Sequence, residues 1–471
     1  MAIATINPAT GRRIKEFDEL IPSEIEQRVR NAHDAFPVWS HTPLGERIKV
    51  VARAGQLLDQ RKDEYGRLMT LEMGKLIDAG REEAAKCATG CRYYAEHGAR
   101  MLADEPVMPA GGDEHGYVAF HPLGVVLAIM PWNFPFWQVI RFAAPALVAG
   151  NVGLLKHASN VPQCALALEQ LFLDAGAPKG VFQTLLIGSD AVGQVVEDPR
   201  IAAVTLTGSE GAGSQVARRA GERLKKTVLE LGGSDPFIVM PSANLATAVD
   251  TAVRARVINN GQSCIAAKRF IVHDKIADAF ETQFATAMRA LKVGDPMDPS
   301  TQLGPLAAKQ LVDDLEVQVN ESVKRGARVL TGGTRRAGAG FFFEPTVLVN
   351  IPQDSPAYRD ELFGPVAAIF RARDATDAVR IANDTRFGLG SAVWTADANE
   401  ARYFARELQA GTVFVNGMVA SDPRFPFGGV KASGYGRELS SFGLREFVNI
   451  KTVRVFGLGA SAEQMGNPLS E

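Results

Sequence analysis

GVVLAIM at 124–130 and VGLLKHA at 152–158 begin a series of short apolar runs that decides the fold of this chain. The series continues with VFQTLLIG (181–188), AAVTLTG (202–208) and KTVLELGG (226–233), and helix-like segments separate its members. Apolar runs of this length that alternate with helices are typical of βαβ units, in which a parallel sheet carries helices on both faces. Residues 124–232 therefore predict an α/β nucleotide-binding domain.

The flanking regions predict further helices and a second α/β block. Apolar residues recur every three or four positions through residues 22–70, and residues 80–102 continue in the same way, so both regions are expected to be helical. From 233 to 430, helix-like and strand-like segments alternate again. The segment LREFVNIKTVRVFG (444–457) predicts a strand at an edge or an interface, and residues 458–471 look like an exposed tail.

The composition excludes several classes of protein. The 471 residues carry 51 Lys and Arg against 53 Asp and Glu, a formal net charge of −2, which gives no argument for a nucleic-acid partner. Four cysteines are too few for a disulfide framework and fit a reducing cytoplasm. Polar residues interrupt the most apolar region, 123–155, and no secretory signal opens the chain. We expect a soluble cytoplasmic protein without a membrane span.

Three residues have the chemistry of a catalytic centre. Cys264 lies in a turn among small and polar residues, where a stabilised thiolate is a nucleophile, although a free cysteine is also a common buried residue. Glu230 ends an apolar strand, so it is either a general base or a solvated acid. Asn133 lies among apolar residues in MPWNFP; its amide can stabilise an oxyanion or can hold the turn.

Two segments are candidates for binding a nucleotide. Lys156 ends the strand VGLLK, a position that suits a ribose hydroxyl or a phosphate. Thr207, Gly208 and Ser209 follow another strand and open the next helix, so their backbone N–H groups can face a pyrophosphate. The glycine spacing is not the GxGxxG fingerprint, and by itself it is a weak signal.

Taken together, these segments resemble the NAD(P)-dependent aldehyde dehydrogenase superfamily, and in particular its short bacterial succinate-semialdehyde dehydrogenases. Glu230 and Cys264 stand 34 positions apart in the motifs LELGG and GQSC, a highly specific combination. The matching stretches run in order along nearly the whole chain: NPATG (7–11), PWNFP (131–135), LLK (154–156), TGS (207–209), LELGGSDP (229–236), GQSC (261–264), ELFGP (361–365) and PFGGVKASGYGRE (426–438).

The resemblance implies a three-part architecture. It consists of a Rossmann-like cofactor domain from residues 1–104 and 124–232, an α/β catalytic domain from 233–430, and a small β element for oligomerisation from 105–123 and 447–457. A homodimer or homotetramer is the expected assembly. Cys264 is the implied nucleophile, Asn133 the oxyanion donor and Glu230 the base that activates water.

The resemblance also implies an NAD(P) site and no metal. The matching cofactor positions are Trp132, Lys156, Ser159, Gly188, Thr207, Gly208, Ser209, Leu231, Glu361 and Phe363. Family members that prefer NAD often carry Glu where this chain has Ser159. A serine does not repel the 2′-phosphate and Lys156 can pair with it, so NADP is expected to be used at least as well as NAD. Alternatively, Ser159 caps the helix that follows and both cofactors are accepted.

The substrate assignment depends on Arg141, which stands in an otherwise mostly apolar helix eight positions after Asn133. Succinate-semialdehyde dehydrogenases have an Arg at the matching place, where it can hold the substrate carboxylate. The alternative is a salt bridge to a neighbouring helix. A second Arg found in many longer members is Ile258 here, so Ser421 and Gln262 are expected to complete the carboxylate site.

The sequence leaves three more functions open. The first is a dehydrogenase of other short or medium-chain aldehydes, in which Arg141 is structural. The second is a relative that has lost catalysis and serves as a binding or structural protein, although Cys264, Glu230, Asn133 and Glu361 are all present. The third is an acylating, coenzyme A-dependent enzyme, which the presence of Glu230 argues against.

Overall fold

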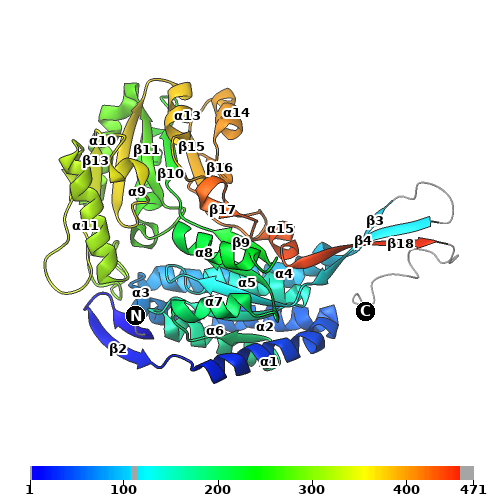
Figure 1. Ribbon diagram of the computed structural model, residues 1–471. Coiled ribbons are helices and arrows are strands. Elements are labelled where there is room, and N and C mark those ends of the chain that lie inside the picture. The colour runs from blue at the N-terminus through cyan, green and yellow to red at the C-terminus, as the bar shows by residue number, and fades with distance from the viewer. Residues whose placement is uncertain (1–2, 108–113, 457–471) are drawn as a thin grey trace.

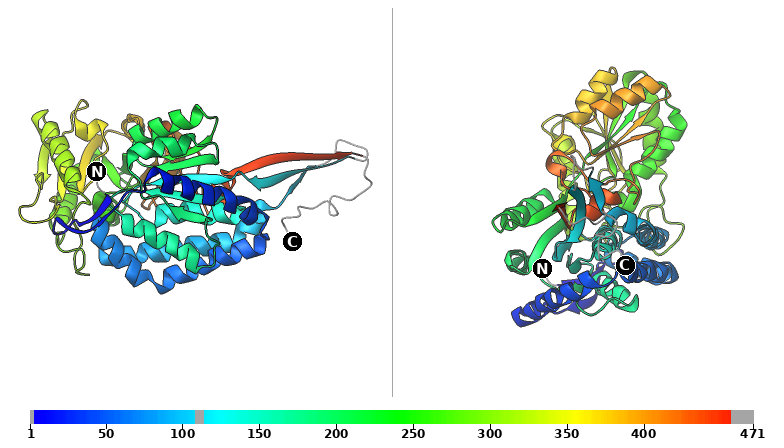
Figure 2. Two further views of the ribbon diagram at one scale, coloured as in Figure 1. Left: turned by 60° about the horizontal axis from the view of Figure 1, so that its bottom comes forward. Right: turned by 90° about the vertical axis from the view of Figure 1, so that its right-hand side faces the viewer.

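The computed structural model describes residues 3–107 and 114–456 (Figure 1). The predicted tail at 458–471 lies outside the described residues, as do residues 1–2, 108–113 and 457. Two large sheets form the body of the molecule and a narrow third sheet projects from it (Figure 2). The predicted fold class, a Rossmann-like domain joined to an α/β catalytic domain, is confirmed by the sheets and by the solved structures described below.

The first large sheet has the strand order β17-β9-β8-β5-β6-β7. Strands β5 to β9 pair in parallel, and only β17 is antiparallel. The chain moves outward from β5 through β6 to β7 and then returns to β8 on the other side of β5. This reversal creates a switch point beside β5, where ligands bind in open α/β sheets. The strands are β5 Val125–Met130, β6 Val152–His157, β7 Phe182–Thr184, β8 Ile201–Thr207, β9 Lys226–Glu230 and β17 Gly434–Tyr435.

Helices cover this sheet in layers. Helices α5 and α6 pack on its strands and are covered by α2, α3 and α4 from the amino-terminal region, while α7 and α8 pack together beside β8. Every residue of α5 is buried, including its polar ones. The helices are α1 Pro22–His41, α2 Leu44–Gln60, α3 Lys62–Met73, α4 Ile77–Leu102, α5 Trp137–Ala149, α6 Pro162–Asp174, α7 Ser189–Glu197 and α8 Glu210–Gly221; the hairpin β1 Ile3–Asn7 and β2 Arg12–Phe17 precedes them.

The second large sheet has seven strands in the order β12-β13-β14-β11-β10-β15-β16, all parallel except β12. A separate apolar cluster packs on each of its faces. The strands are β10 Asp235–Val239, β11 Ala267–His273, β12 Arg328–Thr331, β13 Thr346–Val349, β14 Val366–Ala372, β15 Gly390–Trp394 and β16 Thr412–Val415. The helices are α9 Leu245–Val257, α10 Asp274–Arg289, α11 Lys309–Lys324, α12 Pro356–Arg359, α13 Ala375–Asn383 and α14 Ala398–Glu407. The last helix, α15 Ser440–Arg445, packs on α4 and α5 instead.

The third sheet has the order β18-β4-β3 and stands away from the body (Figures 1 and 2). Its strands are β3 Glu105–Val107, β4 Glu114–Pro122 and β18 Val448–Phe456, and β18 pairs antiparallel with β4 along its full length. On β18, Ile450 is 61% exposed and Phe456 is 63% exposed. This strand therefore shows apolar side chains to the surroundings on a thin sheet that has no core of its own.

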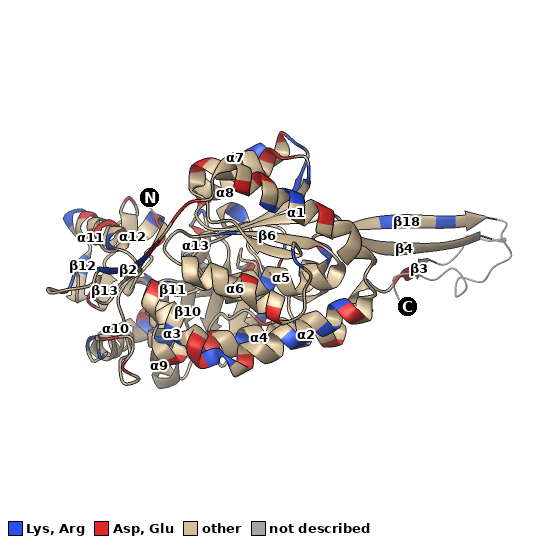
Figure 3. Ribbon diagram, turned by 90° about the horizontal axis from the view of Figure 1, so that it is seen from below, with Lys and Arg blue, Asp and Glu red and all other residues tan. Residues whose placement is uncertain are grey.

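The outer surface carries charges of both signs. Lys and Arg alternate with Asp and Glu along α1, α2 and α4, as Figure 3 shows. This mixture agrees with the formal net charge of −2. Within residues 3–107 and 114–456, no helix is long and apolar enough to cross a membrane.

Candidate active site

A cavity of about 250 Å³ lies where the switch point of the first sheet faces the second sheet. The loops after β5 and β8 and the end of β9 contribute to its wall, and the catalytic domain supplies the rest. The lining residues are Pro131, Trp132, Asn133, Gln138, Thr207, Gly208, Ser209, Leu231, Gly232, Cys264, Leu311, Glu361 and Phe363. The structure thus brings together two predicted catalytic residues and most of the predicted cofactor residues.

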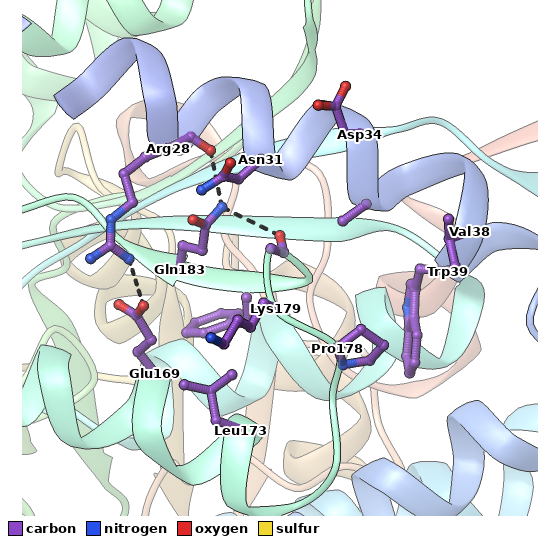
Figure 4. Close-up of a pocket in the computed structure, with 13 residues that line it drawn as sticks. Arg28, Asn31, Asp34, Val38, Trp39, Glu169, Leu173, Pro178, Lys179 and Gln183 are labelled. Carbon is purple, nitrogen blue, oxygen red and sulfur yellow. Dashed lines mark hydrogen bonds and ion pairs between the residues drawn. The ribbon is translucent and has the colours of Figure 1, made fainter. Parts of the chain in front are cut away.

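A larger groove, of about 750 Å³, lies beside α1 and α6 (Figure 4). Arg28 forms an ion pair with Glu169 there at 2.5 Å, and Gln183 donates a hydrogen bond to the Arg28 carbonyl at 3.0 Å. These polar groups already bind one another, and none of the predicted site residues lines this groove. Size alone therefore does not identify the active site.

Cys264 is held at the cavity by an unusual turn before β11. Asn259, Asn260 and Gly261 all have positive φ angles, of 53°, 59° and 79°. A Cβ on Gly261 would lie 2.3 Å from the Gly364 backbone, so only glycine fits. The Asn259 amide secures the turn by donating to the carbonyls of Asn133 at 2.7 Å and Gln262 at 3.0 Å. The turn thus joins the nucleophile loop to the loop after β5.

The electrostatic environment of Cys264 favours the neutral thiol before ligands bind. Burial raises the pKa of the Cys264 thiol to about 12, and the Glu361 carboxylate adds to this effect. The positive charges of Lys268 and Arg141 oppose it. Lys268 is itself fixed beside the nucleophile, because its ammonium donates to the Cys264 carbonyl at 3.0 Å.

Asn133 has a fixed orientation that leaves it a donor. Its side-chain nitrogen donates to the Gln262 carbonyl at 3.1 Å, and its side-chain oxygen accepts from Gln138 at 3.0 Å. A primary amide carries two N–H donors, and the described residues supply an acceptor for one of them. The second N–H is available to an oxyanion that forms on a carbonyl attacked by Cys264.

Glu230 is buried at the carboxyl end of β9, and neither of its carboxylate oxygens has a hydrogen-bond partner among the described residues. Burial raises the pKa of Glu230 well above its ordinary value, and the charge of Glu438 adds to the increase. Arg141 and Arg437 act in the opposite direction. A raised pKa suits a general base, because the protonated group then forms at a smaller cost.

Gly428 makes room for this carboxylate. Its φ is +153°, and a Cβ there would lie 2.6 Å from Oε1 of Glu230. Any side chain at position 428 would therefore push the base out of its place.

Arg141 lies on α5 but does not line the cavity. Its guanidinium forms a buried ion pair with Glu438, donates to the Thr207 hydroxyl at 3.4 Å and stacks 4.8 Å from the Phe427 ring centroid. The partner expected for this buried charge is therefore a carboxylate of the protein, in the segment between β17 and α15. The positive charge of Arg141 opposes the rise in the pKa values of both Glu230 and Glu438.

The other two predicted substrate residues, Gln262 and Ser421, make different contacts. The side-chain oxygen of Gln262 accepts from the Ala307 amide at 2.8 Å, and its nitrogen donates to the Asn259 carbonyl at 3.4 Å, so Gln262 holds loops together outside the cavity. Ser421 accepts hydrogen bonds from Trp137 at 2.9 Å and from Lys86 at 2.8 Å.

The predicted cofactor residues occupy the ends of strands and helices. Lys156 ends β6, Gly188 precedes α7, and Ser209 caps α8 by accepting from the Ala212 amide at 3.3 Å. Ser159 does not cap α6, because the residue before that helix is Val161. No hydrogen-bond partner for the Ser159 hydroxyl occurs within the described part of the chain.

Two further predicted residues, Glu361 and Phe363, also line the cavity. Glu361 pairs with Lys268 at 3.2 Å. Phe363 meets Trp132 edge to face, with ring centroids 5.8 Å apart. Two aromatic rings at the mouth of a cavity provide a surface for a flat ring.

Several functional neighbours give no signal in the sequence. Gln138 orients Asn133, and Glu438 neutralises Arg141. Glu19 accepts a hydrogen bond from the Gly188 amide at 3.2 Å. Burial lowers the pKa of Lys156, and the negative charge of Glu19 opposes this decrease. These residues come from segments far along the chain, so only the fold brings them to the site.

Comparison with known proteins identifies the class. The pattern of the aldehyde dehydrogenase family matches residues 1–453, and this chain belongs to that family. The chain is 55% identical to Succinate-semialdehyde dehydrogenase [NADP(+)] 1 of Mycobacterium tuberculosis over 454 residues, 96% of this chain and 99% of the relative. The family predicted from the motifs is therefore confirmed.

Solved structures agree with this assignment. Succinic semialdehyde dehydrogenase from Streptococcus pyogenes, crystallised with NADP+, superposes with a TM-score of 0.94 at 37% identity and covers 96% of this chain and 99% of its own. The structure of Gox0499, which gives insights into cofactor and substrate selection by that protein, superposes with a TM-score of 0.95 at 41% identity. The match covers 97% of this chain and 100% of Gox0499.

Proposed function

We propose that this protein oxidises succinic semialdehyde to succinate, and that it uses NADP+ as the oxidant at least as well as NAD+. The observation that carries the proposal is that Cys264 and Asn133 line one switch-point cavity and that Glu230 directly precedes the lining residue Leu231, in a chain 55% identical to a protein named succinate-semialdehyde dehydrogenase [NADP(+)]. Two observations among the described residues support the proposed steps: one N–H of the Asn133 amide has no acceptor, and neither carboxylate oxygen of Glu230 has a hydrogen-bond partner.

The Cys264 thiol releases its proton to water, and the thiolate then attacks the aldehyde carbonyl and forms a thiohemiacetal. The negative charge moves to the former carbonyl oxygen, where the free N–H of Asn133 and the Cys264 backbone amide stabilise it. Loss of a hydride from this intermediate leaves a thioester on Cys264. Glu230 then takes a proton from water, which attacks the thioester and displaces the Cys264 sulfur. The acid is released, and the proton passes from Glu230 to the sulfur, which restores the thiol.

The residues at the cavity fit a nicotinamide dinucleotide. The Ser159 hydroxyl has no partner in the described chain, the amino end of α8 opens at Ser209, and Trp132 and Phe363 provide aromatic walls. Lys156 and Ser159 would hold the adenosine ribose and its 2′-phosphate, and Glu361 would bind the ribose at the reactive end. When bound, the cofactor accepts the hydride that the thiohemiacetal releases.

The cofactor preference is tested at Ser159. In the variant Ser159→Glu, the added carboxylate would repel the 2′-phosphate, so the ratio of kcat/KM for NADP+ to that for NAD+ is expected to fall by about 10- to 100-fold. Ser159→Ala removes the donor without adding a charge and should lower the ratio less. Steady-state kinetics with both cofactors measures these ratios, and an unchanged ratio in Ser159→Glu would show that this position does not select the cofactor.

The substrate is tested by comparing succinic semialdehyde with butyraldehyde, which has no carboxylate. A charge-assisted contact to the carboxylate is worth about 1.5–3 kcal/mol, so kcat/KM should favour the semialdehyde by about 10- to 100-fold. NADPH formation with purified protein measures both values. Equal use of the two aldehydes would instead support a dehydrogenase of other short or medium-chain aldehydes. A non-catalytic relative would form no NADPH in this assay, and an acylating enzyme would require coenzyme A.

We further propose that the protein is a homodimer or homotetramer of the cytoplasm. The projecting sheet supports the oligomer, because Val107, Ile450 and Phe456 are each more than half exposed, and β18 and β3 are the outer strands of this sheet among the described residues. On this basis residues 105–123 and 447–457 form the oligomerisation element, residues 1–104 with 124–232 the cofactor domain, and residues 233–430 the catalytic domain. The four cysteines are all free thiols, which suits a reducing compartment.

A further inference from the structure

Lys268 on β11 is a buried cation with four acceptors around it. It is 1% exposed, and its ammonium donates to the carbonyls of Ser263 at 2.7 Å, Cys264 at 3.0 Å and Ala266 at 3.0 Å. The Glu361 carboxylate, which lines the cavity, pairs with the ammonium at 3.2 Å. An ammonium has three N–H donors, so Lys268 is shared between the loop that carries Cys264 and the Glu361 carboxylate.

The carboxylates and carbonyls around Lys268 favour its charged form. Burial lowers the pKa of Lys268, and the charge of Arg256 adds to the decrease, whereas the negative charges of Glu361 and Asp235 oppose it. Three carbonyl oxygens also accept from the ammonium, and a hydrogen bond with one charged partner is stronger than a bond between neutral groups. The loop therefore meets a positive charge rather than a neutral amine.

The Ser263 carbonyl and the Cys264 N–H belong to the same peptide unit. In a trans peptide these two groups point in opposite directions, so an ammonium that binds the carbonyl does not block the N–H. Among the described residues, the Cys264 N–H has no acceptor. A positive charge at the carbonyl oxygen draws electrons from the peptide nitrogen and makes its N–H a stronger donor. Lys268 thus acts on the backbone amide that the proposed mechanism uses to stabilise the oxyanion.

The fold fixes both partners of this contact. Lys268 lies in β11, which pairs with β10 on one side and β14 on the other, so its side chain starts from a fixed position inside the sheet. The Ala266 amide donates to the Ser263 carbonyl at 3.1 Å and closes the turn. A Cβ at Gly233 would lie 2.4 Å from the Cys264 carbonyl oxygen, so this oxygen is closely packed as well.

We propose that Lys268 is a positioning residue that activates the oxyanion donor: its ammonium holds the Ser263 carbonyl and thereby strengthens the Cys264 N–H toward the negative charge that forms on the attacked carbonyl. Asn133 donates to that charge directly, whereas Lys268 acts through the peptide and touches neither substrate nor cofactor. This inference rests on the proposed function, because it assumes that Cys264 attacks a carbonyl. It does not depend on which aldehyde is the substrate.

The first test uses 4-nitrophenyl acetate, an activated ester whose hydrolysis needs neither succinic semialdehyde nor a cofactor. The Cys264 thiolate attacks the ester carbonyl and 4-nitrophenolate leaves; water then attacks the acetyl thioester, releases acetate and restores the thiol. Stopped-flow absorbance of 4-nitrophenolate resolves a burst for acylation and a steady phase for deacylation. Both steps pass through an oxyanion, whereas only acylation begins with ionisation of the thiol.

Lys268→Gln keeps a neutral donor and removes the charge. Loss of an oxyanion donor typically lowers kcat by about 10²- to 10³-fold, so weakening one should slow both phases by about 10- to 100-fold and change KM for the ester little. Lys268→Arg keeps the charge and should recover most of the rate. Arg269→Gln is the matched control, because Arg269 is a buried cation on the same strand that donates to the carbonyls of Ala382 at 2.9 Å and Ile381 at 2.5 Å; both phases should be retained.

The outcomes separate this proposal from the proposed function. Unchanged phases in Lys268→Gln, or an equal loss in Arg269→Gln, would overturn the role of Lys268 and leave the proposed function intact. A slower burst with an unchanged steady phase would also overturn it, because Lys268 would then act on the thiol alone. A wild-type enzyme that hydrolyses the ester but does not oxidise succinic semialdehyde would contradict the proposed function and leave the role of Lys268 standing.

The second test observes the peptide itself and needs no turnover. Ser followed by Cys occurs once in the chain, at Ser263 and Cys264, so protein with 13C at the serine carbonyls and 15N in cysteine gives a single signal in an NMR experiment that correlates the two. Lys268→Gln should shift the Ser263 carbonyl carbon and the Cys264 amide proton upfield, because the peptide is then less polarised.

Glu361→Gln keeps this second test decisive even where Lys268→Gln does not fold. Glutamine has nearly the same shape as glutamate but no charge, so the Lys268 ammonium is left to the carbonyls of the loop. The Ser263 carbonyl carbon and the Cys264 amide proton should then shift downfield, opposite to the shift in Lys268→Gln. Signals that keep their wild-type positions in Glu361→Gln would overturn the proposal that Lys268 polarises this peptide.

Discussion

Replacing Cys264 with alanine is expected to lower NADPH formation by at least about 10⁴-fold, without loss of the fold or of NADP+ binding. The thiol lines the cavity directly, and no second thiol can take its place. Cys87, Cys91 and Cys164 are fully buried, and burial raises the pKa of each thiol, so none of them supplies a nucleophile.

Steady-state NADPH formation measures this loss, and the quenching of tryptophan fluorescence by NADP+ checks binding. Cys91→Ala is the matched control, since it removes a buried thiol from α4 and should keep the activity. Residual turnover of a few percent in Cys264→Ala would contradict the assignment of the nucleophile.

Replacing Glu230 with glutamine is expected to separate the two halves of the reaction. Formation of the thioester uses Cys264 and Asn133, so one equivalent of NADPH should appear rapidly. Hydrolysis then lacks its base, and the following steady rate should fall by about 10²- to 10⁴-fold. Glutamine has nearly the same shape, and the carboxylate oxygens have no hydrogen-bond partner among the described residues, so the change breaks no bond that supports the fold.

Stopped-flow absorbance resolves the burst and the steady phase. Glu222→Gln, a change of the same chemistry at an exposed glutamate of the Arg218 ion pair, should behave like the wild type. A slow linear time course without a burst would mean that Glu230 acts before hydride transfer, which contradicts its role as the base for hydrolysis.

The alternation of residues 124–232 predicts the five parallel strands of the first sheet, because strands buried on both faces must be apolar along their whole length, but it does not predict the antiparallel strand β17. The structure places Glu230 and Thr207 side by side, because the carboxyl ends of the parallel strands β9 and β8 meet at one edge. The need of Arg141 for a partner followed from its apolar surroundings. The sequence could not name that partner, because Glu438 lies far along the chain and is brought to Arg141 only by the packing of the segment after β17 on α5.

Lys86 shows the limit of sequence reasoning most clearly. A lysine on a helix is usually solvated, and nothing near position 86 indicates burial. Its partner Ser421 stands 335 positions away, and the pair forms only because the loop after β16 crosses α4 and α5. Such contacts depend on tertiary packing, which local periodicity does not encode.

The measurement that tests the central claim most directly is the intact mass of Glu230→Gln after rapid mixing with succinic semialdehyde and NADP+. We expect the protein to gain the mass of one succinyl group, which peptide mapping should locate on Cys264, while Cys264→Ala under the same conditions gains nothing. An unmodified Glu230→Gln protein after the NADPH burst, or a succinyl group on any other residue, would contradict the proposed division of labour between Cys264 and Glu230.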